Sequence, residues 1–249
     1  MPPVTHPTVG FLVGPGVLAH VDGVRALAER LGVVAINTWG AKGVFRWDSP
    51  YHGGTAGLQA RDFELAGLGE VDVLVTSGLD PAEVTRRPWE GRAEVVDVDP
   101  AGLAAFGEAW PHPPAAPTAP RLYTDLAAVV GPLYDDPATP AARARALSLG
   151  LAPGGVVVAP PGLVGFWVAR TWPTVGPGSV IVPATTEPGR AECAAREAAA
   201  EGRPVLFVTD TLDDIPEAVP GVEVVVWDGD LAIPRSLLDV AGPLVAWAS

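Results

Sequence analysis

The stretch that decides the fold is Gly40-Ala41-Lys42-Gly43-Val44-Phe45, which continues into a second glycine-rich segment over residues 47–57. The apolar run before it, residues 33–36, is predicted to form a buried strand because it is short and β-branched. The glycines therefore follow the carboxyl end of a strand, where open α/β sheets bind their ligands. Lys42 is the single lysine beside fifteen arginines. It is either a ligand-binding group or a solvated loop charge, and the sequence leaves both interpretations open.

The chain before this stretch has the pattern of a strand, a glycine turn and a helix. Residues 9–13 are predicted to form a strand, and residues 20–31 carry apolar side chains at helical spacing. The turn between them, Gly14-Pro15-Gly16, lies where dinucleotide-binding folds hold phosphate on backbone N–H groups. Pro15 has no N–H group, and short glycine turns of this kind also occur without a ligand.

The chain after the stretch repeats the alternation of helix and strand. Residues 59–68 are predicted to form a helix, residues 71–77 a strand that ends at Gly78, and residues 93–100 a strand that carries Asp97 and Asp99. Such alternation predicts a doubly wound, mainly parallel sheet. An acidic residue at a strand end either binds a ribose hydroxyl or caps the next helix, and both roles stay open here.

A proline-rich segment, residues 111–120, divides the chain because five prolines in ten residues suit neither a sheet nor a helix interior. Strand patterns over residues 155–159, 179–182, 204–208 and 222–226 then alternate with helical patterns, the last of them over residues 236–247. We therefore expect two Rossmann-like α/β domains, residues 1–110 and 121–249, joined by the linker 111–120.

Composition excludes several classes of protein. The formal charge of −13 disfavours contact with nucleic acid or anionic membrane surfaces. No apolar run is long enough to span a membrane, and the first twenty residues lack the basic segment of a secretory signal. We therefore expect a cytoplasmic protein. The lone Cys193 lies in a helical pattern and is expected to be a buried, inert thiol. The four histidines are scattered, and no catalytic residues are assigned.

The first half of the chain resembles the central domain of thiamine-diphosphate enzymes of the acetolactate synthase type. The resemblance runs in order through segments 14–18, 26–32, 37–45, 49–54, 71–80 and 95–100. It implies a Rossmann-like domain that in some relatives holds FAD or an adenine nucleotide. The positions that correspond to ligand-facing ones are Gly14, Gly16, Thr38, Trp39, Gly78, Asp97 and Asp99, to which the loop adds Gly40 and Lys42. Many relatives instead have an empty, well-packed central domain.

The second half resembles the diphosphate-binding domain of the same enzymes more distantly. In the family, a Gly-Asp-Gly at a strand end and a later Asn hold Mg²⁺, which binds the cofactor's diphosphate. Here the matching strand ends are Thr209-Asp210-Thr211 and Trp227-Asp228-Gly229, and the chain between them is short. The resemblance thus implies that Asp210 and Asp228 are metal ligands. The simpler alternative is that the same two residues are helix caps or loop carboxylates.

The pyrimidine-binding domain that comes first in these enzymes has no counterpart in this sequence. We therefore expect a truncated relative that is catalytically silent alone and acts in protein association or small-molecule binding, as a homo-oligomer. The alternative is one subunit of a split thiamine-diphosphate-dependent lyase or transferase, completed by a separate pyrimidine-domain chain. In that case thiamine diphosphate and Mg²⁺ would bind only with the partner chain.

Overall fold

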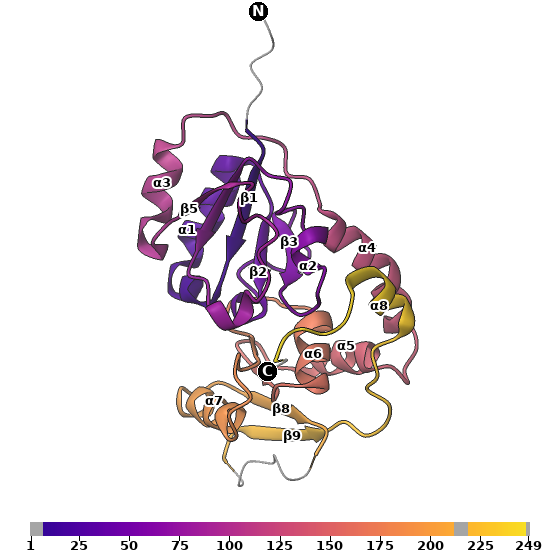
Figure 1. The fold of residues 1–249 in the computed structure, drawn as a ribbon. Helices are drawn as coiled ribbons and strands as arrows, with labels where there is room; N and C mark the ends of the chain where they lie inside the picture. The colour runs from indigo at the N-terminus through magenta and orange to yellow at the C-terminus, as the bar shows by residue number, and fades with distance from the viewer. Residues whose placement is uncertain (1–6, 212–218, 248–249) are drawn as a thin grey trace, which may run out of the picture.

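The computed structural model describes residues 7–211 and 219–247 and contains two parallel sheets (Figure 1). The first sheet has the strand order β3-β2-β1-β4-β5. Its strands are β1 (Val9–Val13), β2 (Ala35–Thr38), β3 (His52–Ala56), β4 (Val73–Ser77) and β5 (Glu94–Asp97). This is the order of a Rossmann half, in which the chain reverses direction across the sheet between β1 and β4.

The second sheet has the order β7-β6-β8-β9, and all its pairs are parallel. Its strands are β6 (Val156–Val158), β7 (Val180–Ile181), β8 (Val205–Thr209) and β9 (Val222–Val226). The predicted fold class, α/β with two mainly parallel sheets, is confirmed.

Each sheet has one face covered by helices of its own half. On the first sheet these are α1 (Val21–Leu31) and α3 (Leu103–Ala109). Helix α1 forms because Val24, Leu27 and Leu31 share one buried face, and it ends at Gly32, whose φ of 68° suits a residue without Cβ. On the second sheet, α7 (Arg190–Ala200) packs three alanines against β6 and β8.

The remaining faces of both sheets meet in one continuous hydrophobic core. The helices that build it are α2 (Asp62–Leu65), α4 (Arg121–Val130), α5 (Pro140–Gly150), α6 (Leu163–Thr171) and α8 (Arg235–Ala241). Helix α4 packs against β3, α2 and α8, so α8 lies beside α4 next to the first sheet in Figure 1. Short 3-10 helices connect these elements: η1 (Pro15–His20), η2 (Trp39–Ala41), η3 (Pro81–Glu83), η4 (Pro100–Gly102) and η5 (Gly131–Tyr134).

The proline-rich segment 111–120 has no helix or strand and lies against the first half of the chain. The N–H of Ala115 donates to the carbonyl of Leu31, and Arg30 donates to the carbonyls of Trp110 and His112. The domain boundaries proposed from the sequence stay a prediction, but the shared core joins the two halves closely.

Several local expectations are corrected. The glycine-rich segment 47–57, for which no strand was predicted, contains strand β3, which pairs with β2 across a register shift. The predicted helix 59–68 shrinks to α2 because Gln59 instead bridges to Leu244, and Ala60 donates to the carbonyl of Pro243. The closing helix ends at Ala241, before Gly242 and Pro243. Cys193 is exposed rather than buried.

Within the described ranges, the helices all fall short of the length and apolar character that a membrane crossing demands.

Candidate functional site

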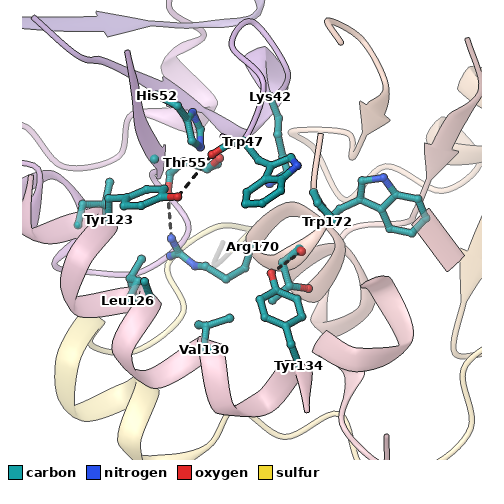
Figure 2. Close-up of a pocket in the computed structure, with 16 residues that line it drawn as sticks. Lys42, Trp47, His52, Thr55, Tyr123, Leu126, Val130, Tyr134, Arg170 and Trp172 are labelled. Atoms are coloured by element: carbon teal, nitrogen blue, oxygen red, sulfur yellow. Dashed lines mark hydrogen bonds between the residues drawn. The ribbon is translucent and has the colours of Figure 1, made fainter. Parts of the chain in front are cut away.

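A cavity of about 230 Å³ lies where the first sheet meets helices α4 and α6. The first sheet and its loops contribute Lys42, Trp47, His52, Gly54 and Thr55. The opposite wall comes from α4, η5 and the end of α6, and consists of Leu122, Tyr123, Leu126, Ala127, Val130, Gly131, Tyr134, Arg170, Thr171, Trp172 and Pro173. Figure 2 shows Lys42 and His52 on one side and the apolar side chains of α4 on the other. The cavity is thus mainly apolar, with a few polar groups.

The loop after β2 brings Lys42 to this cavity. Gly43 has a φ of 94°, and a Cβ there would lie 2.0 Å from the carbonyl oxygen of Gly176, so only glycine permits this approach. The N–H of Trp47 donates to the carbonyl of Thr174 at 3.1 Å. The loop is therefore held against the second half of the chain, and Lys42 is only 5% exposed. The interpretation of Lys42 as a solvated loop charge is wrong.

Arg170, which lines the cavity, forms a buried ion pair with Asp62 of the first half of the chain. Arg170, on α6, donates to both carboxylate oxygens of Asp62 at 2.8 Å and to the carbonyl of Thr55 at 2.9 Å. The side chains of Arg170 and Asp62 are 3% and 0% exposed. Burial raises the pKa of Asp62, while Arg170 and the N–H groups of Leu58 and Gln59 act in the opposite direction. Figure 2 shows Arg170 extended between the two walls.

The amine of Lys42 has no such partner. Within residues 7–211 and 219–247, no hydrogen bond or ion pair reaches its Nζ atom. Burial and, to a lesser degree, the nearby charge of Arg170 lower the pKa of Lys42 to about 7. A large fraction of the molecules therefore carries a neutral amine at neutral pH.

His52 is the second unpartnered polar group of the cavity. Its ring packs edge-on against Tyr123 at a centroid distance of 5.9 Å, and its buried Nδ1 has no hydrogen-bond partner in the described structure. Burial, with a contribution from Lys42, lowers the pKa of His52 to about 4. The imidazole is therefore neutral at physiological pH and is free to accept or donate one hydrogen bond.

Gly14, Gly16 and Gly78 lie together in the crevice between β1 and β4, and their close packing fills it. The N–H of Gly14 donates to the carbonyl of Ser77 and that of Gly16 to the carbonyl of Gly78. A Cβ on Gly14 would lie 2.4 Å from the oxygen of Gly78. Both N–H groups that were candidates for phosphate binding are thus used within the protein.

Two further candidates lie near this edge: Gly40 lines a second cavity, and Trp39 lies in the core. Gly40 donates to Glu83, and burial raises the pKa of that carboxyl to about 7 against the opposing effect of Thr38 and Gly40. Trp39 is 1% exposed and packs against Trp247 in a tilted arrangement with ring centroids 5.3 Å apart. The cavity, of about 480 Å³, has the charged lining residues Asp80, Glu83, Glu197, Glu201 and Arg203. Its net negative charge opposes a phosphate ligand, and Lys42 lies in the other cavity.

The strand-end acids have structural partners. Asp99 caps η4 by accepting from the N–H of Ala101, and Asp97 accepts from the hydroxyl of Thr76 at 2.7 Å. Asp99 is thus an N-cap. Both residues are exposed.

The two proposed metal ligands follow adjacent strands, since Thr209 pairs with Val226 in register at the ends of β8 and β9. Asp210 is exposed, and the Asp228 side chain is 97% exposed and pairs with Arg143. Within the described ranges, no group of three His, Cys, Asp or Glu side chains could hold a metal ion. The carboxylates present therefore do not fit the family's Mg²⁺ site.

Sequence analysis missed most of the first cavity. His52, Asp62 and Arg170 were not candidates, although Arg170 stands in the otherwise apolar segment Leu163–Thr171. A charge inside such a segment indicates a buried partner or a functional site.

Comparison with protein families gives one match. Residues 7–109 match the family model described as "Thiamine pyrophosphate enzyme, central domain". Comparison with curated proteins gives no match. The family match covers the first sheet and its helices, and it supports a relationship of this part of the chain with thiamine-diphosphate enzymes.

Proposed function

We propose that this chain is a relative of thiamine-diphosphate enzymes that is catalytically silent by itself and binds a small molecule in the cavity between Lys42 and α4. The family match over residues 7–109 supports the relationship. The observation that carries the binding role is the buried Lys42, which lines a cavity and whose amine has no partner among residues 7–211 and 219–247. An unpaired buried cation is costly unless a ligand supplies its partner.

The ligand's size and character follow from the walls of the cavity. An apolar cavity of about 150 Å³ binds benzene, so about 230 Å³ accommodates a ring with a short substituent. Leu126 and Val130 offer apolar contact, and Trp47 and Trp172 add aromatic surface. The ligand is therefore a small, largely apolar molecule whose single acidic or polar group faces Lys42.

Calorimetric titration with benzoate at pH 7 tests the proposal, with benzyl alcohol as the uncharged match. We expect benzoate to bind more tightly because its carboxylate pairs with protonated Lys42. Lys42→Met should weaken benzoate roughly 10- to 150-fold, the value of one charge-assisted hydrogen bond. Arg190→Met, which removes an exposed charge on α7, is the control and should leave binding unchanged. Equal affinity of the wild type and Lys42→Met would contradict the proposal.

The second candidate is one subunit of a split thiamine-diphosphate-dependent lyase or transferase. It rests on the family match over residues 7–109, whereas Asp210 and Asp228 do not support it. Titration with thiamine diphosphate and Mg²⁺ in the presence of a separate pyrimidine-domain chain, followed by a pyruvate-consumption assay, separates the candidates. Micromolar binding with turnover by the two chains together would favour the enzyme over the silent binding protein.

A further inference from the structure

The amine of Lys42 differs from the other buried charged groups of this protein. Asp62 and Arg170 bond to each other at 2.8 Å, and Glu83 accepts from the N–H of Gly40. Lys42 is also buried, at 5% exposure, but in the described parts of the chain no hydrogen bond or ion pair reaches its ε-amine. It lines a cavity whose opposite wall is mainly apolar. Such an amine is placed to react with a ligand rather than to stabilise the fold.

We infer that Lys42 captures a small apolar aldehyde, such as an aromatic aldehyde, as an imine inside this cavity. The inference rests on the proposed binding function and names the reacting group of the ligand. The Nζ lone pair forms a bond to the carbonyl carbon and gives a carbinolamine. The carbonyl oxygen then leaves as water with the two hydrogens of the neutral amine, and a C=N double bond remains. No oxidant or reductant takes part.

The surroundings of Lys42 favour each requirement of this reaction. A nucleophilic amine must be neutral, and burial beside the fixed charge of Arg170 keeps a large fraction of Lys42 in that form near pH 7. The apolar side chains Leu126 and Val130 line the same cavity and offer contact to the body of the aldehyde. His52 also lines the cavity, and its imidazole, which burial keeps neutral, can transfer a proton from nitrogen to oxygen in the carbinolamine.

The chain's composition makes the test unusually direct, because Lys42 is the sole lysine. The folded protein is incubated with benzaldehyde and cyanoborohydride at pH 7, and the reduced adduct is located by intact mass and peptide mapping. We expect stable labelling on the peptide that contains Lys42. Labelling of the α-amino group alone would overturn the inference.

A matched variant measures the special reactivity of Lys42 within one molecule. Arg190→Lys adds an exposed amine of ordinary pKa on α7 without altering the cavity. At pH 7 only about one in a thousand or fewer such amines is neutral, so Lys42 should be labelled at least about tenfold faster than the added amine. The preference should disappear when the protein is unfolded in urea. Equal labelling rates in the folded state, or a preference that survives unfolding, would contradict the inference.

The same experiment separates this inference from the proposed binding function. Benzoate should slow the labelling of Lys42 because both molecules occupy one cavity. If benzoate binds and depends on Lys42 but benzaldehyde leaves no adduct there, imine formation is wrong and the binding function stands. If Lys42 is labelled preferentially while benzoate neither binds nor protects it, the inference survives and the proposed acidic ligand is wrong.

Discussion

Burying an unpartnered amine should make Lys42 a destabilising residue, and we predict that Lys42→Met raises the free energy of unfolding at pH 7. The pKa of Lys42 falls from its ordinary value of 10.5 to about 7 in the folded protein. This gap of about 3.5 corresponds to about 5 kcal/mol, since each unit of pKa is worth about 1.36 kcal/mol. Local relaxation and water entry reduce the cost, so we expect a gain of about 2 to 5 kcal/mol. Methionine fills a similar volume, and no cavity is created.

The pH dependence of this gain has a definite sign. Below pH 7 both the folded and the unfolded states hold the proton on Lys42, and the full cost is present. Between pH 7 and 10.5 the unfolded state binds more protons, so the stability of the wild type rises with pH relative to the variant. Above 10.5 the amine is neutral in both states. The charged and titratable groups around the amine are Arg170 with its partner Asp62, His52, Tyr123 and Tyr134, all of which the variant retains.

Urea denaturation of both proteins at intervals between pH 6 and 10.5 measures the difference. The gain for Lys42→Met should be largest at pH 6 to 7 and shrink toward zero near pH 10.5. Arg190→Met controls for a change in net charge, because Arg190 is an exposed residue on another helix. A variant less stable than the wild type at pH 7, or a gain that does not change with pH, would refute the placement of Lys42 as a buried, unpartnered amine.

Three further predictions concern stability. Arg170→Met should cost about 3 to 5 kcal/mol in urea denaturation because Asp62 is left charged and buried, and adding Asp62→Leu should restore most of the loss; an additive double variant would contradict the pairing. Gly14→Ala should lower the free energy of unfolding by about 3 kcal/mol or more, because the added Cβ meets a backbone oxygen. Gly102→Ala, where the added Cβ meets open space, should change it by less than about 1 kcal/mol, and equal effects of the two variants would contradict the close packing at Gly14. The pKa of the Glu83 carboxyl is about 7 in the folded protein against an ordinary 4.5, so between these values the folded state binds more protons than the unfolded state. The free energy of unfolding should therefore fall by up to about 3 kcal/mol from pH 4.5 to 7, and Glu83→Gln should abolish this decline.

The sequence was sufficient for the parallel architecture because strands and helices alternate with clear apolar patterns. Strands β1 and β9 have the predicted bounds, and Gly14 and Gly78 lie at adjacent strand ends as parallel topology requires. Strand β3 was missed because its sequence, His-Gly-Gly-Thr-Ala, has the composition of a loop. The segment nevertheless forms a strand. Gly54, with a φ of 108°, lies at the register shift between β3 and β2 and packs under Leu122 of α4.

The cavity could not be predicted because its parts come together only through tertiary packing. Arg170 and Asp62 are 108 residues apart in sequence, and no local pattern joins them. The burial of Lys42 depends on Gly43 lying against Gly176, which belongs to the other half of the chain. The sequence did single out Lys42 through its rarity, but rarity does not distinguish an exposed charge from a buried amine. That distinction required the position of the second half.

The two cavities make opposite demands on a ligand, and this contrast favours the cavity of Lys42. At the crevice between β1 and β4, a nucleotide would have to separate Gly14 and Gly16 from Gly78, break two backbone hydrogen bonds and approach a lining rich in carboxylates. The Lys42 cavity requires neither step. It is already open to a volume of about 230 Å³, and in the described part of the chain the amine of Lys42 and the Nδ1 of His52 lack partners. A ligand there gains interactions that the protein does not make for itself, whereas a ligand in the crevice must first replace interactions that the protein already has. The glycine turn therefore stabilises the first sheet, and the neighbouring loop carries Lys42, the centre of the proposed ligand site.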